Sequence, residues 1–460
     1  MSKGISIFWF RRDLRLEDNA ALYQALKSEW PVLPLFIFDR NILDKLSDRA
    51  DARVEFIHNA LAEIKKELKE QGSDLLVKYG TPEDVWPEVL AQFEVKAVYT
   101  NHDYEPYARR RDEKVSLLLE KQQIPLRTFK DHVIFEEEEI TKKAGGVYTV
   151  FTPYSKTWKA KLDEKEGTIE ENGQQVKLSY YLKPYPTEKY FSNLHQTSEA
   201  FSFPTLAEMN FETTDIEIPS KTVSRGLIKN YDDTRDFPAV DGTSRLGIHF
   251  RFGTISIREK ARRARQLNET FLNELIWRDF YAQILANFPH VAENSFRPEY
   301  DFIEWRNNEE EFAAWCKGKT GYPIVDAGMR ELNATGFMHN RVRMITASLL
   351  TKHLLIDWRW GEAYFAEKLL DFDLASNNGG WQWSASTGCD AQPYFRVFNP
   401  ELQSKKFDPE GVFLRKWLPE LKSCSSKEIH KPIDVDGYPK QIVEHQDQKA
   451  LAIELFKKSH

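Results

Sequence analysis

Hydrophobic positions along the first 130 residues fall into short runs, and the stretches between them have helical spacing. The apolar runs are residues 5–10, 32–39, 74–80, 96–101 and 126–135. Helical patterns lie near 17–28, 50–71, 82–93 and 106–123, and Thr81-Pro82-Glu83-Asp84 is a typical helix start. This alternation predicts a parallel sheet covered by helices on both faces.

The alternation stops near residue 136. Residues 136–220 are polar and contain proline, so we expect a long connecting segment on the surface, with a helix near 152–165. From residue 221 onward helical spacing dominates, as Val342, Ile345 and Leu349 illustrate. We therefore expect an α/β domain (1–135), an interdomain linker (136–220) and an all-α domain (221–460).

Length and composition favour a multidomain protein of the cytoplasm. The chain has 460 residues, which suggests two or three domains, and 41% of them are hydrophobic. No apolar run approaches the roughly 20 residues of a membrane span, and the N-terminus has no signal-peptide pattern. The three cysteines are far apart, with no disulfide framework and no metal-ligand spacing. We expect neither a metal nor a membrane partner.

Charge and common motifs leave the function open. The net charge of −7 does not indicate a nucleic-acid binder, although a local basic groove is compatible with it. No G-x-G-x-x-G follows the first strand, and the GKT at 318–320 lacks the glycine five positions earlier that a P-loop requires. Aromatic residues make up 13% of the chain, with 12 Trp, which suits large cores, ring stacking or electron transfer.

Residues 377–396, NNGGWQWSASTGCDAQPYFR, have an unusual composition. Paired Asn and paired Gly both weaken helices, so we do not expect a helix here. Two Trp residues one position apart are rarely needed only to fill space. The pattern indicates a place where the backbone comes close to a flat ligand.

Three further stretches are candidates for chemistry. The turn Gly242-Thr243-Ser244-Arg245 could bind a phosphate or simply cap a helix. Residues 273–284 place an acid, two aromatic rings and an Arg at helical spacing, which suits either a site or a buried stripe edged by a salt bridge. Arg341 and Arg343 at a helix start oppose the macrodipole, so we expect them to meet anions, either Asp371 and Asp373 or a phosphate.

Several blocks, in order along the chain, resemble the photolyase/cryptochrome family. They are WFRRDLRLEDN (9–19), RDFPAVDGTSRL (235–246), NELIWRDFY (273–281), GKTGYPIVDAGMRELNATGFMHNRVRMI (318–345) and DFDLASNNGGWQWSASTGCDAQPYFRVFNP (371–400). The likeness runs from Ile5 to about residue 446 and is closest to class I photolyases that repair cyclobutane pyrimidine dimers. It implies a Rossmann-like α/β antenna domain, a linker and a helical domain that holds FAD.

The resemblance also implies the residues that hold FAD. Its phosphates and ribityl chain would be held by Tyr231, Thr243, Ser244, Arg245, Leu246 and Gly247, where Gly247 replaces the Ser of close relatives. Asp371 and Asp373 would border the flavin ring, with Arg343 paired to Asp371. Asn377 would face flavin N5, and the two following glycines would let the backbone approach the ring.

Roles in electron transfer and lesion binding follow from the same likeness. Trp381, Trp358 and Trp305 would carry electrons from the surface to the flavin, with core packing as the alternative. The lesion pocket would comprise Glu274, Trp277, Arg278, Tyr281, Asn340, Arg341, Met344 and Trp383. Glu274 would hydrogen-bond the dimer. Backbone phosphates would meet Arg235, Arg278, Arg341 and Gln403, whereas the basic tract 258–266 is expected to be a solvated helix face.

The implied activity is light-driven repair of UV-damaged DNA by electron transfer from reduced FAD, in a monomer. Alternatives are a (6-4) photolyase, a cryptochrome photoreceptor and an electron-transfer flavoprotein without a DNA role. His339 alone does not match the paired histidines of (6-4) enzymes, and Asn377 and the short C-terminal tail favour repair over signalling. The implied antenna is 5,10-methenyltetrahydrofolate, although Ala108 replaces a folate-contacting Glu; 8-hydroxy-5-deazaflavin or no antenna are the alternatives.

Overall fold

The computed structural model describes residues 4–171 and 173–458. Contacts divide the chain into two compact units. The α/β unit comprises Met1–Ile140, Lys156–Lys221 and Leu246–Gln266, and the helical unit comprises Thr141–Ser155, Thr222–Arg245 and Leu267–His460. The predicted domain limits at residues 135 and 220 stay a prediction.

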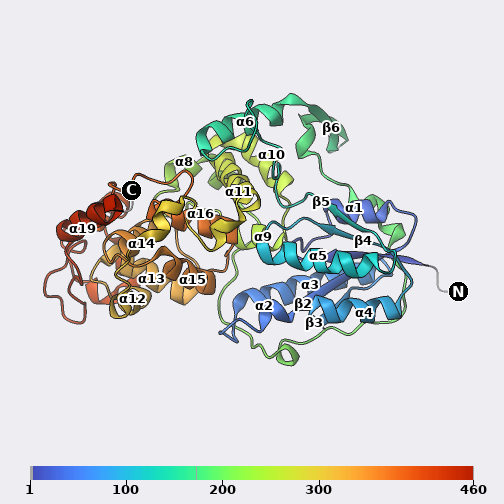
Figure 1. Cartoon of the computed structure of the whole chain (residues 1–460), viewed down its shortest axis with the longest axis horizontal. Coiled ribbons are helices and arrows are strands. Elements are labelled where there is room, and N and C mark those ends of the chain that lie inside the picture. The colour runs from blue at the N-terminus through green and yellow to red at the C-terminus, as the bar shows by residue number, and fades with distance from the viewer. Residues whose placement is uncertain (1–3, 172, 459–460) are drawn as a thin grey trace. The chain divides into compact units, whose positions relative to one another are not determined.

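The α/β unit contains the predicted parallel sheet (Figure 1). Its strands are β1 (Ile5–Phe10), β2 (Val32–Asp39), β3 (Leu76–Gly80), β4 (Val95–Asn101) and β5 (Leu126–Phe129), in the order β3-β2-β1-β4-β5. In register, Ile7 of the central strand lies between Leu33 and Val98. The helices are α1 (Ala20–Leu26), α2 (Arg40–Leu43), α3 (Ala52–Glu70), α4 (Pro82–Gln92), α5 (Pro106–Glu120), α9 (Gly247–Phe252) and α10 (Ile257–Leu267).

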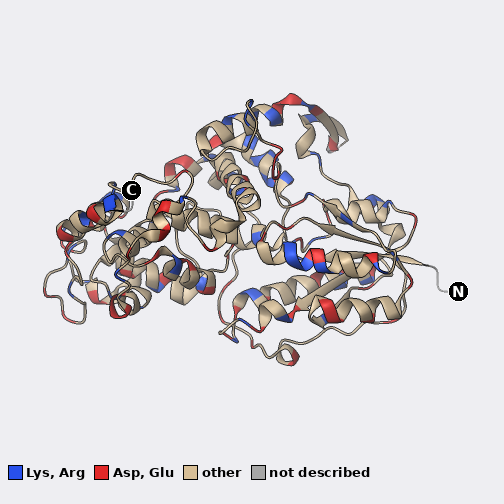
Figure 2. Ribbon diagram, in the orientation of Figure 1, with Lys and Arg blue, Asp and Glu red and all other residues tan. Residues whose placement is uncertain are grey.

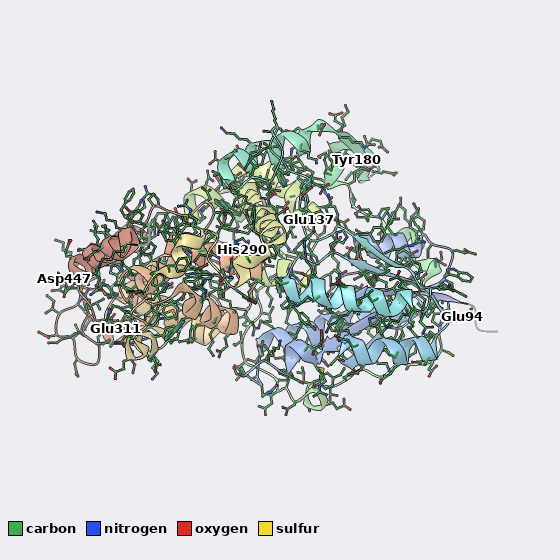
Figure 3. All side chains as sticks on the ribbon, in the orientation of Figure 1. Glu94, Glu137, Tyr180, His290, Glu311 and Asp447 are labelled. Atoms are coloured by element: carbon green, nitrogen blue, oxygen red, sulfur yellow. The ribbon has the colours of Figure 1, made fainter. Side chains whose placement is uncertain are left out.

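Three details of this unit differ from the prediction. The last strand stops at Phe129 rather than 135, because the carboxylate of Asp131 turns inward to Arg15 (2.6 Å) and Arg258 (2.8 Å). The short helix α2 was not predicted. The expected linker contains a hairpin of β6 (Glu166–Glu171) and β7 (Gln174–Ser179), near the labelled Tyr180 (Figure 3).

The remainder of that segment is mostly irregular. The helix predicted near 152–165 is confirmed as α6 (Phe151–Glu164). Short 3-10 turns follow: η1 (Tyr180–Leu182), η2 (Thr187–Asn193) and η3 (Ala207–Met209). A bridge between Val32 and Leu194 ties the later part of the segment to the start of β2, and Lys156–Lys221 belongs to the α/β unit.

The charged motif 9–19 builds a network of ion pairs inside the α/β unit. Arg11 pairs with Asp112, Arg12 with Asp103 at 3.2 Å, and Arg15 with Asp131. The expectation of a solvated face for 258–266 is wrong in part. Arg258 is 5% exposed and joins Asp18 (2.8 Å) to Asp131, and Lys260 is also buried. Figure 2 shows basic and acidic segments interspersed along the helices in that view.

The helical unit has no strand among its described residues, as predicted. Its helices are α7 (Arg225–Lys229), α8 (Tyr231–Thr234), α11 (Glu269–Asn287), α12 (Glu309–Cys316), α13 (Pro323–Thr335), α14 (Asn340–Lys352), α15 (Trp358–Lys368), α16 (Leu374–Ala385), α17 (Pro400–Phe407), α18 (Val412–Trp417) and α19 (His445–Lys458). Short 3-10 turns are η4 (Pro289–Ala292), η5 (Pro298–Phe302) and η6 (Pro419–Leu421).

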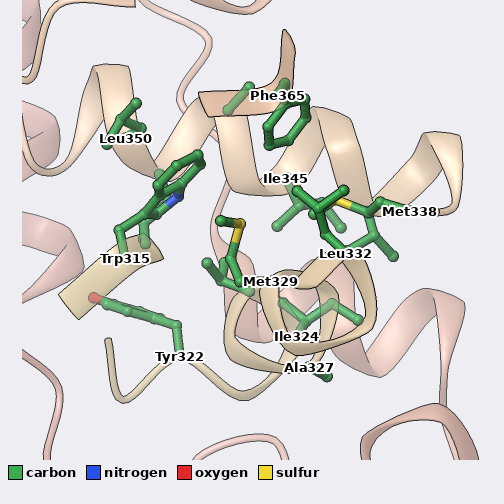
Figure 4. Close-up of a cluster of buried hydrophobic side chains, with 14 of the residues drawn as sticks. Trp315, Tyr322, Ile324, Ala327, Met329, Leu332, Met338, Ile345, Leu350 and Phe365 are labelled. Carbon is green, nitrogen blue, oxygen red and sulfur yellow. The ribbon is translucent and has the colours of Figure 1, made fainter. Parts of the chain in front are cut away.

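The core of this unit forms around α13 and α14. Trp315, Met329 and Ile345 lie in one buried cluster (Figure 4). The GKT stretch serves this core rather than a phosphate, because the N–H groups of Thr320 (2.7 Å) and Gly321 (3.0 Å) donate to the buried Asp326 carboxylate. This agrees with the absence of a P-loop motif.

Candidate functional site in the helical unit

The stretch rich in Asn, Gly and Trp is helical, so the expectation of a non-helical segment is wrong. Residues Leu374–Ala385 form α16, whose N-cap Asp373 accepts a hydrogen bond from the N–H of Ser376. Tertiary contacts outweigh the low helix propensity of Asn and Gly in this stretch. The side chains of Asn377 and Asn378 donate to the carbonyls of Glu362 (3.1 Å) and Val291 (2.8 Å), which ties the helix to its neighbours.

The two glycines of α16 face different surroundings. A Cβ at Gly379 would lie 2.2 Å from the ring of Tyr281, so only glycine allows α16 to approach α11 this closely. A Cβ at Gly380 would meet no atom within 4 Å. Gly379 therefore serves packing, whereas Gly380 leaves an open stretch of helix surface.

The three predicted electron-transfer tryptophans differ in exposure. Trp381 (2%) and Trp358 (1%) are buried, whereas Trp305 is half-buried and its ring lies 5.9 Å from that of Phe456. Trp381 packs edge-on against Phe365 with ring centroids 5.0 Å apart. This graded exposure is compatible with a route from the interior to solvent and equally with ordinary packing.

The predicted face of α11 is aromatic and contains a buried acid. Trp277 stacks flat on Phe151 (centroids 3.6 Å, 3° between planes) and lies 5.4 Å from Tyr281. Glu274 hydrogen-bonds Arg235, and burial raises the pKa of Glu274 although Arg235 opposes the shift. Phe151 was not predicted, because it lies 126 residues before Trp277 in sequence and no local signal links them.

The start of α14 presents its two arginines to two different acids. Arg343 binds Asp371 through two contacts, at 2.9 and 3.1 Å, as predicted. The expected pairing of Arg341 with Asp371 or Asp373 is wrong. Its guanidinium pairs with Asp236 at 2.9 Å instead, because Asp373 is occupied as the cap of α16.

His339 caps this helix. Its Nδ1 accepts the N–H of Arg341 at 3.1 Å, so the imidazole is neutral and protonated on Nε2. Burial lowers the pKa of His339 to about 4. The side chain is 3% exposed and therefore does not reach the neighbouring pocket as a proton donor.

A pocket of about 430 Å³ lies beside the start of α14 and the second half of α17. Four predicted DNA or lesion residues line it: Arg341, Met344, Trp383 and Gln403. Sequence reasoning missed its other lining residues, which are Asp232, Asp236, Phe237, Arg396, Phe398, Lys406 and Phe407. Tyr281 and Trp383 also line a smaller cavity of about 20 Å³. Trp383 thus connects the pocket with the aromatic face of α11.

The remaining lesion candidates lie outside the lining of the larger pocket. Glu274, Trp277, Arg278 and Tyr281 come from α11, and Asn340 begins α14 with an exposed side chain. The structure therefore groups the candidates into the pocket itself and the neighbouring face of α11.

Residues predicted to hold FAD are partly brought together. Tyr231 packs edge-on against Phe271 (5.0 Å) beneath the guanidinium of Arg235 (5.5 Å). Arg245 has a left-handed backbone (φ 50°) and lies 4.6 Å above the ring of Phe337. The N-cap residue of α9 is Leu246, whose side chain has no hydrogen-bonding atom. Leu246 and Gly247 belong to the α/β unit.

Asn377 fits a flavin that donates an N–H. Its Nδ2 is bonded to the Glu362 carbonyl, and its Oδ1 accepts no hydrogen bond from the described residues. The amide oxygen of Asn377, the open surface at Gly380 and the Arg343–Asp371 pair offer an acceptor, room and a cation on α14, α16 and the turn before α16. No group of side chains suited to a metal occurs among the described residues.

Comparisons with known proteins identify the family. Residues 6–172 match DNA photolyase, and residues 271–458 match the FAD binding domain of DNA photolyase. The deoxyribodipyrimidine photo-lyase of Vibrio cholerae is 37% identical, covering 98% of this chain and 99% of its own. The chain therefore belongs to the DNA photolyase family, which implies FAD as its cofactor.

Solved structures share the whole fold. A bacterial class III photolyase from Agrobacterium tumefaciens has a TM-score of 0.83 at 31% identity and covers 100% of this chain and 98% of its own. An archaeal photolyase from Sulfolobus tokodaii, described with two FAD molecules, has a TM-score of 0.80 at 36% identity, with 98% and 99% covered. No helix among the described residues is long and apolar enough to span a membrane.

Proposed function

We propose that this protein is a light-driven repair enzyme that splits cyclobutane pyrimidine dimers in UV-damaged DNA. The observation that carries the proposal is the 430 Å³ pocket lined by Trp383, Met344 and Arg341. It occurs in a chain that is 37% identical over 98% of its length to a deoxyribodipyrimidine photo-lyase. Bound, fully reduced FAD would supply a photoexcited electron donor.

The chain's own residues would hold and tune this cofactor. Asn377 would accept a hydrogen bond from the reduced ring, and Arg343 would balance its negative charge while Asp371 fixes the guanidinium. Tyr231, Thr243, Ser244, Arg245, Leu246 and Gly247 would hold the phosphates and ribityl chain, and Asp373 would border the ring.

The pocket suits a dimer that has left the duplex. An extruded base needs flat walls and a few hydrogen bonds to its edges. Trp383 supplies one wall, and Trp277 is held rigid by its stacking on Phe151. Glu274 would hydrogen-bond the dimer, and its hydrogen bond with Arg235 already fixes the position of the carboxylate. Arg278, Tyr281 and Asn340 would complete the lesion contacts.

Backbone phosphates would be contacted around the pocket rim. Arg235 and Gln403 are predicted to contact these phosphates. Arg396 and Lys406 add exposed cations that line the same pocket. Phe395 (59% exposed) and Leu402 (60%) stand beside these cations. Apolar side chains so placed can fill the gap that an extruded base leaves in the duplex.

The state of His339 favours a cyclobutane dimer over a (6-4) lesion. By the resemblance to the family, chemistry on a (6-4) lesion requires a histidine acid. His339 has its Nδ1 committed to capping α14 and a pKa of about 4, and no histidine lines the pocket among the described residues. A signalling role is disfavoured because residue 377 is Asn rather than the acid of plant cryptochromes.

The tryptophan route can be tested apart from repair. Trp305→Phe should slow photoreduction of oxidised FAD at least tenfold while leaving repair by chemically reduced protein unchanged. Absorbance at the flavin bands measures photoreduction, and loss of the dimer measures repair. Equal loss of both activities would mean that Trp305 is only structural.

The antenna proposed for the α/β unit is 5,10-methenyltetrahydrofolate. Ala108 is 3% exposed and offers no polar group, and the Tyr107 hydroxyl is bonded to Asp39. Neither side chain is free to hold a folate in this arrangement. An 8-hydroxy-5-deazaflavin or an absent antenna are the alternatives, and chromophore extraction from purified protein distinguishes the three.

Photorepair of irradiated plasmid tests the function as a whole. Reduced protein should remove sites cut by a dimer-specific endonuclease under blue light and leave them intact in the dark. Dimer sites that persist in the light, with FAD bound and reduced, would contradict the proposal. Light-dependent FAD reduction without any DNA binding would instead support an electron-transfer flavoprotein.

A further inference from the structure

The pocket proposed for DNA contains acidic side chains, which a site for a polyanion would ordinarily avoid. Asp232 and Asp236 both line it. Asp236 is 39% exposed and pairs with Arg341 at 2.9 Å, and Arg235 lies 3.9 Å from the same carboxylate. The cation best placed inside the pocket is therefore already neutralised by the protein itself.

The geometry of Arg341 is fixed on three sides. Its Nη2 donates to Asp236, and its Cζ lies 4.3 Å above the ring of Phe407. Its Nη1 touches only the Sδ of Met344 at 3.7 Å, which is a weak acceptor. Arg341 and Met344 both line the pocket, so these Nη1 hydrogens are available to a better acceptor there.

A neutral pair and a free cation select different ligands. A phosphate gains most from a cation whose charge is not yet balanced, and it is repelled by a neighbouring carboxylate. A pyrimidine carbonyl is uncharged, and it can accept from Nη1 while the Nη2 contact to Asp236 stays in place. The paired arginine should thus bind base edges better than phosphates.

We propose that Asp236 determines specificity by converting Arg341 from a phosphate contact into a reader of pyrimidine carbonyls. This inference rests on the proposed function and deepens it. Arg396 and Lys406 line the same pocket and have no carboxylate partner among the described residues, so they are left to contact phosphate. Asp236 lowers affinity for undamaged DNA and leaves affinity for the extruded dimer almost unchanged.

The test compares Asp236→Asn with Asp232→Asn. Both changes remove one negative charge from the same pocket, but Asp232 accepts from Asn268 (2.7 Å) and has no contact with Arg341. FAD-loaded protein is titrated in the dark with two duplexes, one undamaged and one with a single cyclobutane thymine dimer, at several salt concentrations. Circular dichroism melting of each variant checks that it folds.

We expect Asp236→Asn to bind undamaged duplex about threefold more tightly than Asp232→Asn does. Its salt dependence should be steeper by about one ion, because Arg341 then contacts a phosphate. Affinity for the dimer should change less than twofold, so discrimination falls. The double variant Asp236→Asn with Arg341→Gln should lose this gain, because the effect acts through Arg341.

Two results would overturn the inference, and they are distinguishable. Equal effects of the two Asp→Asn changes, with the unchanged protein still preferring the dimer duplex, would refute the role of Asp236 alone. Equal binding of both duplexes by the unchanged protein would contradict the proposed function and, with it, this inference.

Discussion

Arginines of the α/β unit and of the helical unit look alike in sequence but lie in different surroundings. The side chains of Arg15 (10% exposed) and Arg258 (6%) share one buried acid, Asp131 (1%). The side chains of Arg341 (18%) and Arg343 (25%) are more exposed, and each binds one acid beside open space. The first set is part of the frame of the fold, whereas the second is part of a site.

This difference distinguishes charged motifs that stabilise the fold from charged motifs that can bind a ligand. A buried network leaves no donor for a ligand, and removing one member strands another charge. A half-exposed pair keeps spare N–H groups and contributes little to stability. The following changes test whether frame and site can be separated in this way, beginning with the largest expected effect on the free energy of unfolding.

Arg258→Ala should have the largest effect. It leaves Asp18 and Asp131 buried without their shared cation, and removing one partner of a buried pair costs about 3–5 kcal/mol of unfolding free energy. Denaturant titration measures this loss. The matched control is Arg263→Ala on the same helix, a residue whose side chain is 40% exposed and lies 3.7 Å from Glu259, which should change stability by less than about 0.5 kcal/mol.

The counterpart in the helical unit is Arg343→Ala. It should cost less than about 1 kcal/mol, because the pair with Asp371 is partly exposed, yet it should release FAD during gel filtration. A stability loss as large as that of Arg258→Ala, with FAD retained, would mean that Arg343 stabilises the fold rather than the site. It would contradict the distinction between the two sets of arginines.

Gly379→Ala should be destabilising by about 1–3 kcal/mol. The added Cβ would lie 2.2 Å from the Tyr281 ring, so α16 or α11 must move. Thermal melting of protein without FAD measures the effect of packing alone. An unchanged melting temperature would mean that the two helices are not held at this spacing.

Glu331→Gln should change stability in a pH-dependent way. Burial raises the pKa of Glu331 to about 7, so the folded state holds this proton more tightly than the unfolded state does. The resulting stabilisation is complete below the unfolded pKa of about 4.3 and is lost as pH rises through 7. Gln mimics the protonated form, and the variant should therefore gain about 3 kcal/mol at pH 8 and almost nothing at pH 4. Equal effects at both pH values would contradict the shift.

Gly380→Ala should have a small effect, opposite in sign to that of Gly379→Ala. The added Cβ meets nothing, and Ala favours a helix over Gly by about 0.5–1 kcal/mol. The protein without FAD should therefore melt at a slightly higher temperature. If Gly380 faces the flavin, FAD occupancy should fall at the same time; full occupancy would remove Gly380 from the site.

The sequence predicted the frame better than the site. Runs such as 5–10 and 32–39 became strands because burial on both faces requires continuous apolar residues. Helix α16 was missed because its stability comes from partners such as Val291 and Glu362, which local propensity does not describe. The Asp236–Arg341 pair was missed because 105 positions separate its members.

The most direct test of the account is a comparison of two lesions under identical light. Oligonucleotides carrying one cyclobutane thymine dimer or one (6-4) product are mixed with chemically reduced, FAD-loaded protein, and mass-resolved chromatography follows both. We predict light-dependent loss of the cyclobutane dimer only, with none in the dark. Repair of the (6-4) product, or no repair of the cyclobutane dimer by fully reduced protein, would contradict the assignment of this pocket.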